Sequence, residues 1–375
     1  MLQPADLYAM LRERGIDLFA GVPDSLLANF CAYVTDHAPA EENIITANEG
    51  AAVALACGHY LATGRPGLVY MQNSGEGNAV NPLLSLADPD VYGLPVLLVI
   101  GWRGEPGVHD EPQHVKQGKV TLSLLETMGI PYEVLPDQVD GAKASLDRML
   151  AVMRGKSCPV ALVIKKGVFD KYKLQKIEKT SYELDREGAV KLVVDQLDSR
   201  DVVVSTTGKT SRELFEYREA LKQGHGSDFL TVGSMGHAVQ IALGIALAKK
   251  DRQVFCFDGD GAVIMQMGSL PVTASLPAKN LKHIVFNNGA HDSVGGQPTV
   301  GFRIDLCGIA KASGYRHVES VETTATIREA MGRLRAAEGP AFLEIRVNKG
   351  GREDLGRPTT TTIENRDAFM KFLSE

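Results

Sequence analysis

Short apolar runs rich in β-branched residues recur along the whole chain, separated by longer stretches with a helical pattern. The clearest runs are 68–71, 96–100, 160–165, 202–205 and 342–347, and each ends in a polar or glycine-containing turn. Strands alternating with helices are typical of parallel sheets, because parallel strands need a crossover connection. The pattern therefore predicts an α/β protein built from two doubly wound parallel-sheet domains.

A charged, weakly periodic stretch at 171–183 divides this pattern into two halves. We expect a first domain at 1–170, a linker at 171–184 and a second domain at 185–375. Residues 101–118 hold Gly, Pro, His and Asp without periodicity, so the sequence predicts one long loop there, of the kind that is often functional.

The most informative stretch lies in the second half, where the apolar runs 254–257 and 281–286 flank a helical pattern. The first run leads into Gly259-Asp260-Gly261 and the second into Asn287-Asn288. The carboxyl ends of parallel strands meet at one sheet edge, where open α/β sheets bind ligands. The glycines allow close approach of an anion, and Asp260 and Asn288 supply hard oxygen ligands of the kind that Mg²⁺ takes together with a diphosphate.

Composition narrows the class of protein. The chain has 375 residues, 44% hydrophobic and 23% charged, which is ordinary for a soluble globular protein of two or three domains. A net charge of −6 argues against a nucleic-acid binder. The apolar runs are too short to span a membrane, and the start lacks a signal-peptide pattern. Five cysteines without metal-ligand spacing suggest a reduced, cytoplasmic compartment.

Gly-Asp-Gly followed by Asn-Asn, with 25 residues between Gly261 and Asn287, resembles the signature of thiamine-diphosphate-dependent enzymes. The resemblance implies that Asp260, Asn288 and the backbone carbonyl of Ala290 hold Mg²⁺. It also implies that Glu49 is catalytic and hydrogen-bonds the aminopyrimidine ring of the cofactor. From local sequence alone, a favourable interaction with the helix dipole would explain Glu49 as well.

Further cofactor contacts follow from the same resemblance. Met235 stands where the family places the apolar residue that keeps the cofactor bent, although a core methionine is the plain alternative. Gly208 and Thr210 are expected at the diphosphate or, equally, in ordinary helix capping. The other expected cofactor contacts are Asn73, Gly233, Ser234, Gly259, Gly261 and Ala262.

Segments 21–25, 101–107, 110–114 and 287–297 together are more specific, and they resemble the phosphonopyruvate decarboxylase family, whose near relative is sulfopyruvate decarboxylase. The resemblance implies nonoxidative decarboxylation of 3-phosphonopyruvate to phosphonoacetaldehyde and CO₂, in phosphonate biosynthesis. It also implies a homodimer or larger homo-oligomer, with each active site between the first domain of one chain and the second domain of another.

The resemblance suggests residues for proton transfer and for the substrate. Larger decarboxylases place a catalytic Glu a few residues past the Asn pair, where this chain has 292–294, so the proton donor stays open. The tail 350–359 either folds over the site with Arg357 or is mobile. Sulfopyruvate decarboxylase and a non-catalytic module that binds thiamine diphosphate or a nucleotide are the alternatives. Besides Glu49, the catalytic candidates are Asp24, His114 and His291, and the substrate candidates are Ser25, Asn29, Arg103, Gln113 and Asp292.

Overall fold

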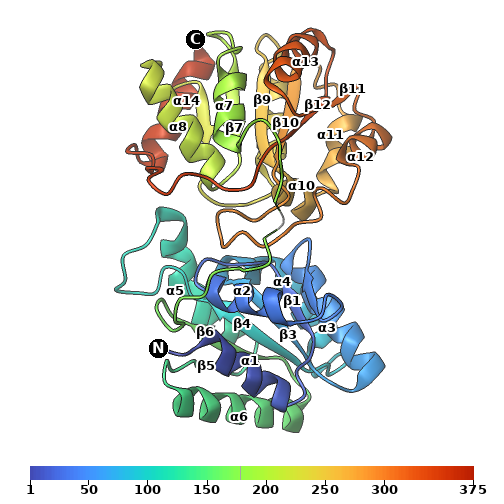
Figure 1. Cartoon of the computed structure of the whole chain (residues 1–375), viewed down its shortest axis with the longest axis vertical. Coiled ribbons are helices and arrows are strands. Elements are labelled where there is room, and N and C mark those ends of the chain that lie inside the picture. The colour runs from blue at the N-terminus through green and yellow to red at the C-terminus, as the bar shows by residue number, and fades with distance from the viewer. Residues whose placement is uncertain (178) are drawn as a thin grey trace. The chain divides into compact units, whose positions relative to one another are not determined.

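The computed structural model describes residues 1–177 and 179–375, which form two compact units (Figure 1). The first unit is Met1–Ile177, and the second covers the described residues 179–375. Each unit contains one six-stranded sheet whose neighbouring strands all pair in parallel, so the predicted α/β fold class is confirmed. Within the described residues, every helix is too short or too polar to cross a bilayer.

The sheet of the first unit has the strand order β2-β1-β3-β4-β6-β5. The non-sequential order requires helical crossovers, which are placed on both sides of the sheet. The elements are α1 (Pro4–Glu13), β1 (Phe19–Gly21), α2 (Ala28–His37), β2 (Asn43–Ile45), α3 (Glu49–Thr63), β3 (Gly67–Gln72), η1 (Asn73–Gly75), α4 (Glu76–Pro82), η2 (Leu83–Ala87), β4 (Val96–Gly101), α5 (Pro112–Thr127), β5 (Tyr132–Val134), α6 (Val139–Lys156) and β6 (Val160–Ile164).

Both faces of this sheet are buried, and β3 shows how the sequence achieves it. Leu68 and Tyr70 point to one face, where they pack with α1, α2 and α6. Val69 and Met71 point to the other face, where they pack with α3, α4 and α5. Because successive side chains of a strand alternate between faces, a strand covered on both sides must be apolar throughout. The continuous apolar runs in the sequence reflect this double burial.

The sheet of the second unit has the order β11-β12-β10-β9-β7-β8. Helices α7, α8 and α13 pack on one face, and α9 and α14 on the other. The elements are α7 (Arg186–Val194), β7 (Val202–Ser205), α8 (Lys209–Leu221), β8 (Asp228–Leu230), α9 (Ala238–Ala248), β9 (Val254–Gly259), α10 (Asp260–Met265), α11 (Ser269–Ser275), β10 (Leu281–Asn287), α12 (Leu306–Ser313), β11 (His317–Val321), α13 (Thr324–Ala336), β12 (Ala341–Arg346) and α14 (Thr362–Ser374).

The predicted loop at 101–118 is wrong over 112–118, because helix α5 begins at Pro112. The buried positions of the helix are His114, Gly118, Thr121 and Leu125, which have helical spacing. Three of these four residues are not hydrophobic, so the apolar pattern that marks other helices is missing from the sequence. Proline at the first helical position is a start signal that the sequence did offer.

The predicted first strand, 16–20, also differs from the structure, in which β1 spans only Phe19–Gly21. Ile16 is fully buried in the core without joining the sheet. The parallel neighbour β2 of this strand is equally short, and before Phe19 the Leu18 carbonyl still accepts a hydrogen bond from the Leu68 N–H of β3 at 2.8 Å. Burial and apolar character therefore extend beyond the strand.

Candidate active site

Four neighbouring strands of the first unit end in polar residues at the same edge of the sheet. Glu49 follows β2, Asp24 follows β1, Asn73 follows β3 and Arg103 follows β4. These residues come from separate parts of the sequence, and the parallel topology brings them to one edge. This is the edge at which open α/β sheets bind ligands.

Glu49 is the first residue of α3, and the preceding Asn48 caps the helix by accepting a hydrogen bond from the Ala51 N–H at 2.9 Å. The Glu49 side chain is only 5% exposed. Asn78 Nδ2 donates a 2.7 Å hydrogen bond to Glu49 Oε2. A Cβ atom at Gly75 would lie 2.4 Å from Glu49 Oε1, so the glycine makes room for the carboxyl group. The carboxyl is thus held in a fixed place and largely away from water.

Asp24 is fully buried directly after β1. Gln72 Nε2 donates to Asp24 Oδ1 at 2.6 Å, and the Leu26 N–H donates to Oδ2 at 2.8 Å. Burial raises the pKa of Asp24, and the hydrogen bonds offset this only in part. Asp24 is therefore a fixed carboxyl group whose protonated form is favoured more than in water.

Arg103 connects Ser25 and Asn73 at this edge. Its Nη1 donates to Ser25 Oγ at 2.6 Å, and Asn73 Nδ2 donates to the Arg103 carbonyl oxygen at 2.8 Å. Arg103 Nε also donates to Asp110 Oδ2 at 2.8 Å in a half-buried ion pair. Partial burial acts to raise the pKa of Asp110, but the hydrogen bonds from Arg103 and the Gly104 N–H outweigh it and lower the pKa. The guanidinium is oriented, and its charge is shared with this carboxylate.

His114 and Gln113 lie in the first turn of α5. Burial lowers the pKa of His114 to about 4, so the imidazole is neutral at neutral pH and can take up a proton. Among the residues that the structure describes, the buried atoms His114 Nδ1 and Gln113 Oε1 have no hydrogen-bond partner. Asn29 is placed differently, since its Oδ1 accepts from the Tyr172 N–H at 3.2 Å in the segment after β6.

In the second unit, the paired strands β9 and β10 bring Asp260 and Asn288 to one edge. Asp260 is 2% exposed, and burial raises its pKa to about 6 although Thr299 Oγ1 and the Asn288 N–H donate to it. Asn288 Oδ1 accepts the Ala290 N–H at 3.1 Å and keeps a second lone pair. A divalent cation would offset the cost of burying the Asp260 carboxylate.

The donors at this edge fit a magnesium site. A carboxylate from Asp260, an amide oxygen from Asn288 and the backbone carbonyl of Ala290 are the hard oxygen ligands that Mg²⁺ takes when it is also bound to phosphates. Ala290 is 7% exposed, so its carbonyl lies in a buried part of the loop. These three residues would hold the ion.

Met235 and His291 meet at the Gly-Asp-Gly turn. A Cβ atom at Gly261 would lie 3.0 Å from His291 Cε1 and 3.3 Å from Met235 Cε. Burial lowers the pKa of His291 to about 4. Met235 and His291 thus come together at a backbone turn where any side chain larger than that of glycine would crowd them.

The N-terminus of α8 offers a place for the diphosphate. Gly208 precedes the helix, and Thr210 in its first turn is 4% exposed. Free N–H groups and the helix dipole at such a terminus favour anions. Gly233 and Ser234 belong to the segment between β8 and α9, and Ala262 lies in α10.

Asp292 and the C-terminal segment are both engaged in the second unit. Asn288 Nδ2, Arg186 Nη1 and the Gly350 N–H all donate to Asp292 Oδ2, at 2.6, 3.2 and 2.9 Å. Further on, Arg212 donates to the Leu355 and Gly356 carbonyl oxygens. The segment 350–356 therefore lies along α7 and α8, and Arg357 follows directly.

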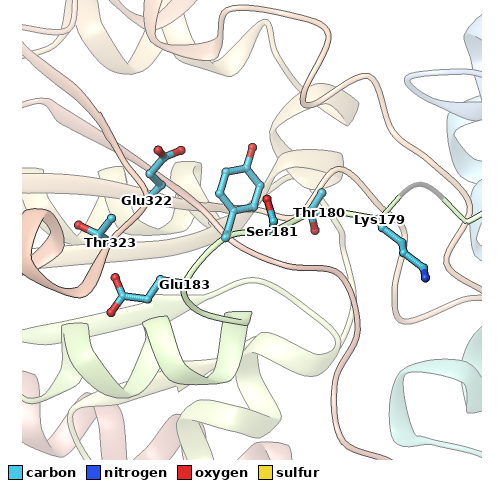
Figure 2. Close-up of a pocket in the computed structure, with 7 residues that line it drawn as sticks. Lys179, Thr180, Ser181, Glu183, Glu322 and Thr323 are labelled. Carbon is cyan, nitrogen blue, oxygen red and sulfur yellow. The ribbon is translucent and has the colours of Figure 1, made fainter.

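A hollow of about 520 Å³ in the second unit lies away from these side chains. Figure 2 shows the seven residues that line it, which include the carboxylates Glu183 and Glu322 but none of the predicted site residues. Glu183 already accepts from the Thr324 N–H at 3.0 Å and from Thr324 Oγ1 at 2.7 Å. The carboxylates of Glu183 and Glu322 make this hollow a poor place for an anionic ligand.

Sequence reasoning missed several polar partners at the two edges. Gln72 and Asp110 were detectable, because Gln72 precedes Asn73 at a strand end and Asp110 belongs to a motif that we singled out. Thr299 and Arg186 carried no local signal, because their contacts with the site arise only from the folding of distant segments.

Comparison with known proteins agrees with this geometry. Residues 5–124 match the N-terminal, and residues 206–345 the C-terminal, thiamine-pyrophosphate-binding domain of thiamine pyrophosphate enzymes. The phosphonopyruvate decarboxylases of Streptomyces viridochromogenes and Streptomyces hygroscopicus are both 33% identical over 100% of this chain and 96% and 95% of their own lengths. The sulfopyruvate decarboxylase of Methanosarcina acetivorans is 28% identical over 91% of this chain and 90% of its own.

The fold and the two sheet edges thus define a thiamine-diphosphate-binding enzyme with separate N- and C-terminal cofactor domains. Similarity over the full length of the chain also identifies the family. The chain belongs to the phosphonopyruvate decarboxylase family, within the carbon–carbon lyases that depend on thiamine diphosphate.

Proposed function

We propose that this protein decarboxylates 3-phosphonopyruvate to phosphonoacetaldehyde and CO₂ with thiamine diphosphate and Mg²⁺. The observation that carries the proposal is the edge of the second sheet, where the buried Asp260 carboxylate accepts a hydrogen bond from the Asn288 N–H. Full-length similarity to two phosphonopyruvate decarboxylases supports the choice of substrate.

The chain's own residues supply geometry and proton transfer. When bound, thiamine diphosphate supplies the electron sink that makes loss of CO₂ feasible. Glu49, oriented by Asn78, would exchange a proton with the aminopyrimidine, and burial strengthens that interaction. The C–C bond to the carboxylate breaks, and a proton takes the place of CO₂ on the former keto carbon. The neutral His114 and His291 are the candidates for handling that proton, and Asp24 for orienting the substrate.

The phosphonate end of the substrate would bind at the first unit's edge. Arg103 and Ser25 are hydrogen-bonded to each other and can turn donors toward a tetrahedral anion. Gln113 has a buried, unpartnered oxygen within the described residues and lies beside His114. These residues make the edge able to receive an anion although the chain as a whole is acidic.

We further propose an oligomer, at least a homodimer, in which the first unit of one chain and the second unit of another share one cofactor. The test mixes two inactive variants, Glu49→Gln and Asp260→Ala. Sites built across chains should recover part of the activity on mixing, since some of them then receive intact residues from both chains. No recovery after demonstrated subunit exchange would refute the shared site.

The five cysteines are all free in the described structure, which supports a cytoplasmic location.

Sulfopyruvate decarboxylation is the second candidate, favoured by the similarity to the enzyme of Methanosarcina acetivorans. Both substrates carry a tetrahedral anion, but phosphonate can bear one more negative charge. The deciding experiment measures CO₂ release by the purified protein from each acid, with thiamine diphosphate and Mg²⁺ present. A higher kcat/KM for phosphonopyruvate is expected, and a clear preference for sulfopyruvate would overturn the assignment.

A further inference from the structure

The side-chain amide of Asn288 is held in one orientation by two opposite contacts. The Ala290 N–H can only donate, so the atom facing it at 3.1 Å must be Oδ1. The Asp292 carboxylate, when ionised, can only accept, so the atom facing it at 2.6 Å must be Nδ2. Rotation of the amide by 180° would break both hydrogen bonds. The oxygen needed for a metal ion is therefore fixed by Asp292 as much as by the backbone.

Asp292 is itself held by groups from two distant parts of the chain. Arg186 Nη1 from α7 and the Gly350 N–H from the segment after β12 both donate to its Oδ2. With Asn288, three donors converge on one carboxylate oxygen. Such contacts hold Asp292 in place, and they leave little reason for it to bind an anionic substrate.

Arg186 is anchored in turn by Glu213 of α8. Its Nε and Nη2 donate to the two carboxylate oxygens of Glu213 at 2.9 and 2.8 Å. Arg186 and Glu213 are 5% and 1% exposed. Two parallel hydrogen bonds fix the plane of the guanidinium and thereby aim Nη1 at Asp292. The path Glu213–Arg186–Asp292–Asn288 is continuous and largely buried.

We propose that Asp292 and Arg186 are positioning residues that present Asn288 Oδ1 to the magnesium ion of the cofactor. This inference rests on the proposed cofactor site and replaces the substrate role expected for Asp292. Partners that orient metal ligands typically contribute a factor of about 10–100 in metal affinity. The C-terminal segment contributes the Gly350 N–H, which donates to Asp292 and so helps to orient Asn288.

A double-mutant cycle separates orientation from general stability. Asp292→Ala is made in the natural chain and in an Asn288→Asp background. A carboxylate at 288 has two equivalent oxygens and needs no neighbour to choose between them. Mn²⁺ serves as the probe, since its free-ion EPR signal reports binding at saturating thiamine diphosphate without any turnover.

In the natural background we expect Asp292→Ala to weaken Mn²⁺ binding about 10- to 100-fold. In the Asn288→Asp background the same change should cost much less affinity, because either oxygen of the new carboxylate can face the ion without a partner that orients it. Equal losses in both backgrounds would overturn the proposal. Should Asp292→Ala fail to fold, Asp292→Leu, which has a similar shape and no hydrogen-bond acceptor, replaces it in both backgrounds and is judged by the same comparison.

Asp251→Ala is the matched control, since it also removes a carboxylate paired with an arginine, at an exposed site of the same unit. It should leave Mn²⁺ affinity unchanged. A wild-type protein that bound no Mn²⁺ with thiamine diphosphate would overturn the proposed function itself, an outcome distinct from equal losses in the cycle. Decarboxylation of a different keto acid would leave the positioning role intact.

Discussion

The two units have the same architecture, but the groups at the carboxyl edges of their sheets are held by different kinds of contact. In the first unit, side chains bond to side chains: Gln72 holds Asp24, and Arg103 bridges Ser25 and Asp110. In the second unit, glycine turns and helix N-termini dominate, and the titratable Asp260 lies among backbone donors. In the function that we propose, one parallel sheet serves acid–base chemistry and the other serves binding of an anion and a metal.

Because of this difference, we expect mutations at the first edge to lower turnover and mutations at the second edge to lower cofactor affinity. A change at the first edge removes proton transfer or substrate contacts and leaves the binding of cofactor largely intact. A change at the second edge removes the cofactor, and turnover falls only as a consequence. Measuring thiamine diphosphate affinity and kcat separately therefore tests the division at each position.

The largest effect is expected for Glu49→Gln, which keeps the shape of the side chain but removes the titratable group. Turnover should fall by about 10²- to 10⁴-fold, the usual contribution of a positioned acid–base group. Affinity for thiamine diphosphate, measured by calorimetry, should change by less than about 3-fold. Glu42→Gln is the control, because it removes a carboxylate paired with Arg12 at the opposite end of β2. Wild-type turnover in Glu49→Gln would exclude Glu49 from the mechanism.

Asp260→Ala should show the reverse pattern. Loss of the buried carboxylate removes a metal ligand, so the affinity for thiamine diphosphate in the presence of Mg²⁺ should fall by about 10²-fold, comparable to about 2.7 kcal/mol. Part of the lost turnover should return at high cofactor and Mg²⁺ concentrations. Calorimetry with and without Mg²⁺ provides the check, and unchanged affinity would contradict the metal assignment.

The same contrast explains which parts of the site could be predicted from the sequence. Asp260 and Asn288 lie in short motifs after two strands, and this pattern predicted their meeting at one edge, whereas Met235 was expected there only from the family resemblance. The first edge depends on long-range partners, such as Asn78 for Glu49 and Gln72 for Asp24. No local spacing reveals such pairs. Helix α5 was missed because its buried face carries His114, Gly118 and Thr121 instead of apolar residues.

A smaller effect is expected for Arg103→Gln. The change removes the cation at the first edge but preserves a hydrogen-bond donor near Ser25. KM for phosphonopyruvate should rise by about 10-fold, the effect of about 1.4 kcal/mol, with thiamine diphosphate affinity unchanged. Adding Asp110→Asn should restore fold stability without restoring KM, since it removes the carboxylate left without its partner. An unchanged KM would show that the phosphonate binds elsewhere.

The smallest effect is expected for Glu76, the first residue of α4. The prediction tests whether a buried carboxylate near the first edge lowers the free energy of unfolding. Glu76 is 2% exposed, its Oε1 has no partner within the described residues, and burial raises its pKa from the usual 4.5 to about 8. Between these two values the folded chain binds more protons than the unfolded chain. The free energy of unfolding should therefore fall as pH rises from about 4.5 to about 8. Glu76→Gln removes this dependence and should stabilise the protein by on the order of 1 kcal/mol at pH 8, because a buried amide without a partner still costs part of the gain.

Urea unfolding of both proteins at pH 5.5 and pH 8 measures the effect of Glu76→Gln. The variant and the natural protein should be nearly equal at the lower pH and differ at the higher one. A constant difference at both values would mean that Glu76 does not titrate on unfolding. Glu338→Gln is the matched control, because its exposed carboxylate pairs with Lys279 and Arg316 at the surface of the second unit. Removing it should produce no rise in stability at pH 8, since an exposed ion pair contributes little and its carboxylate carries no burial cost.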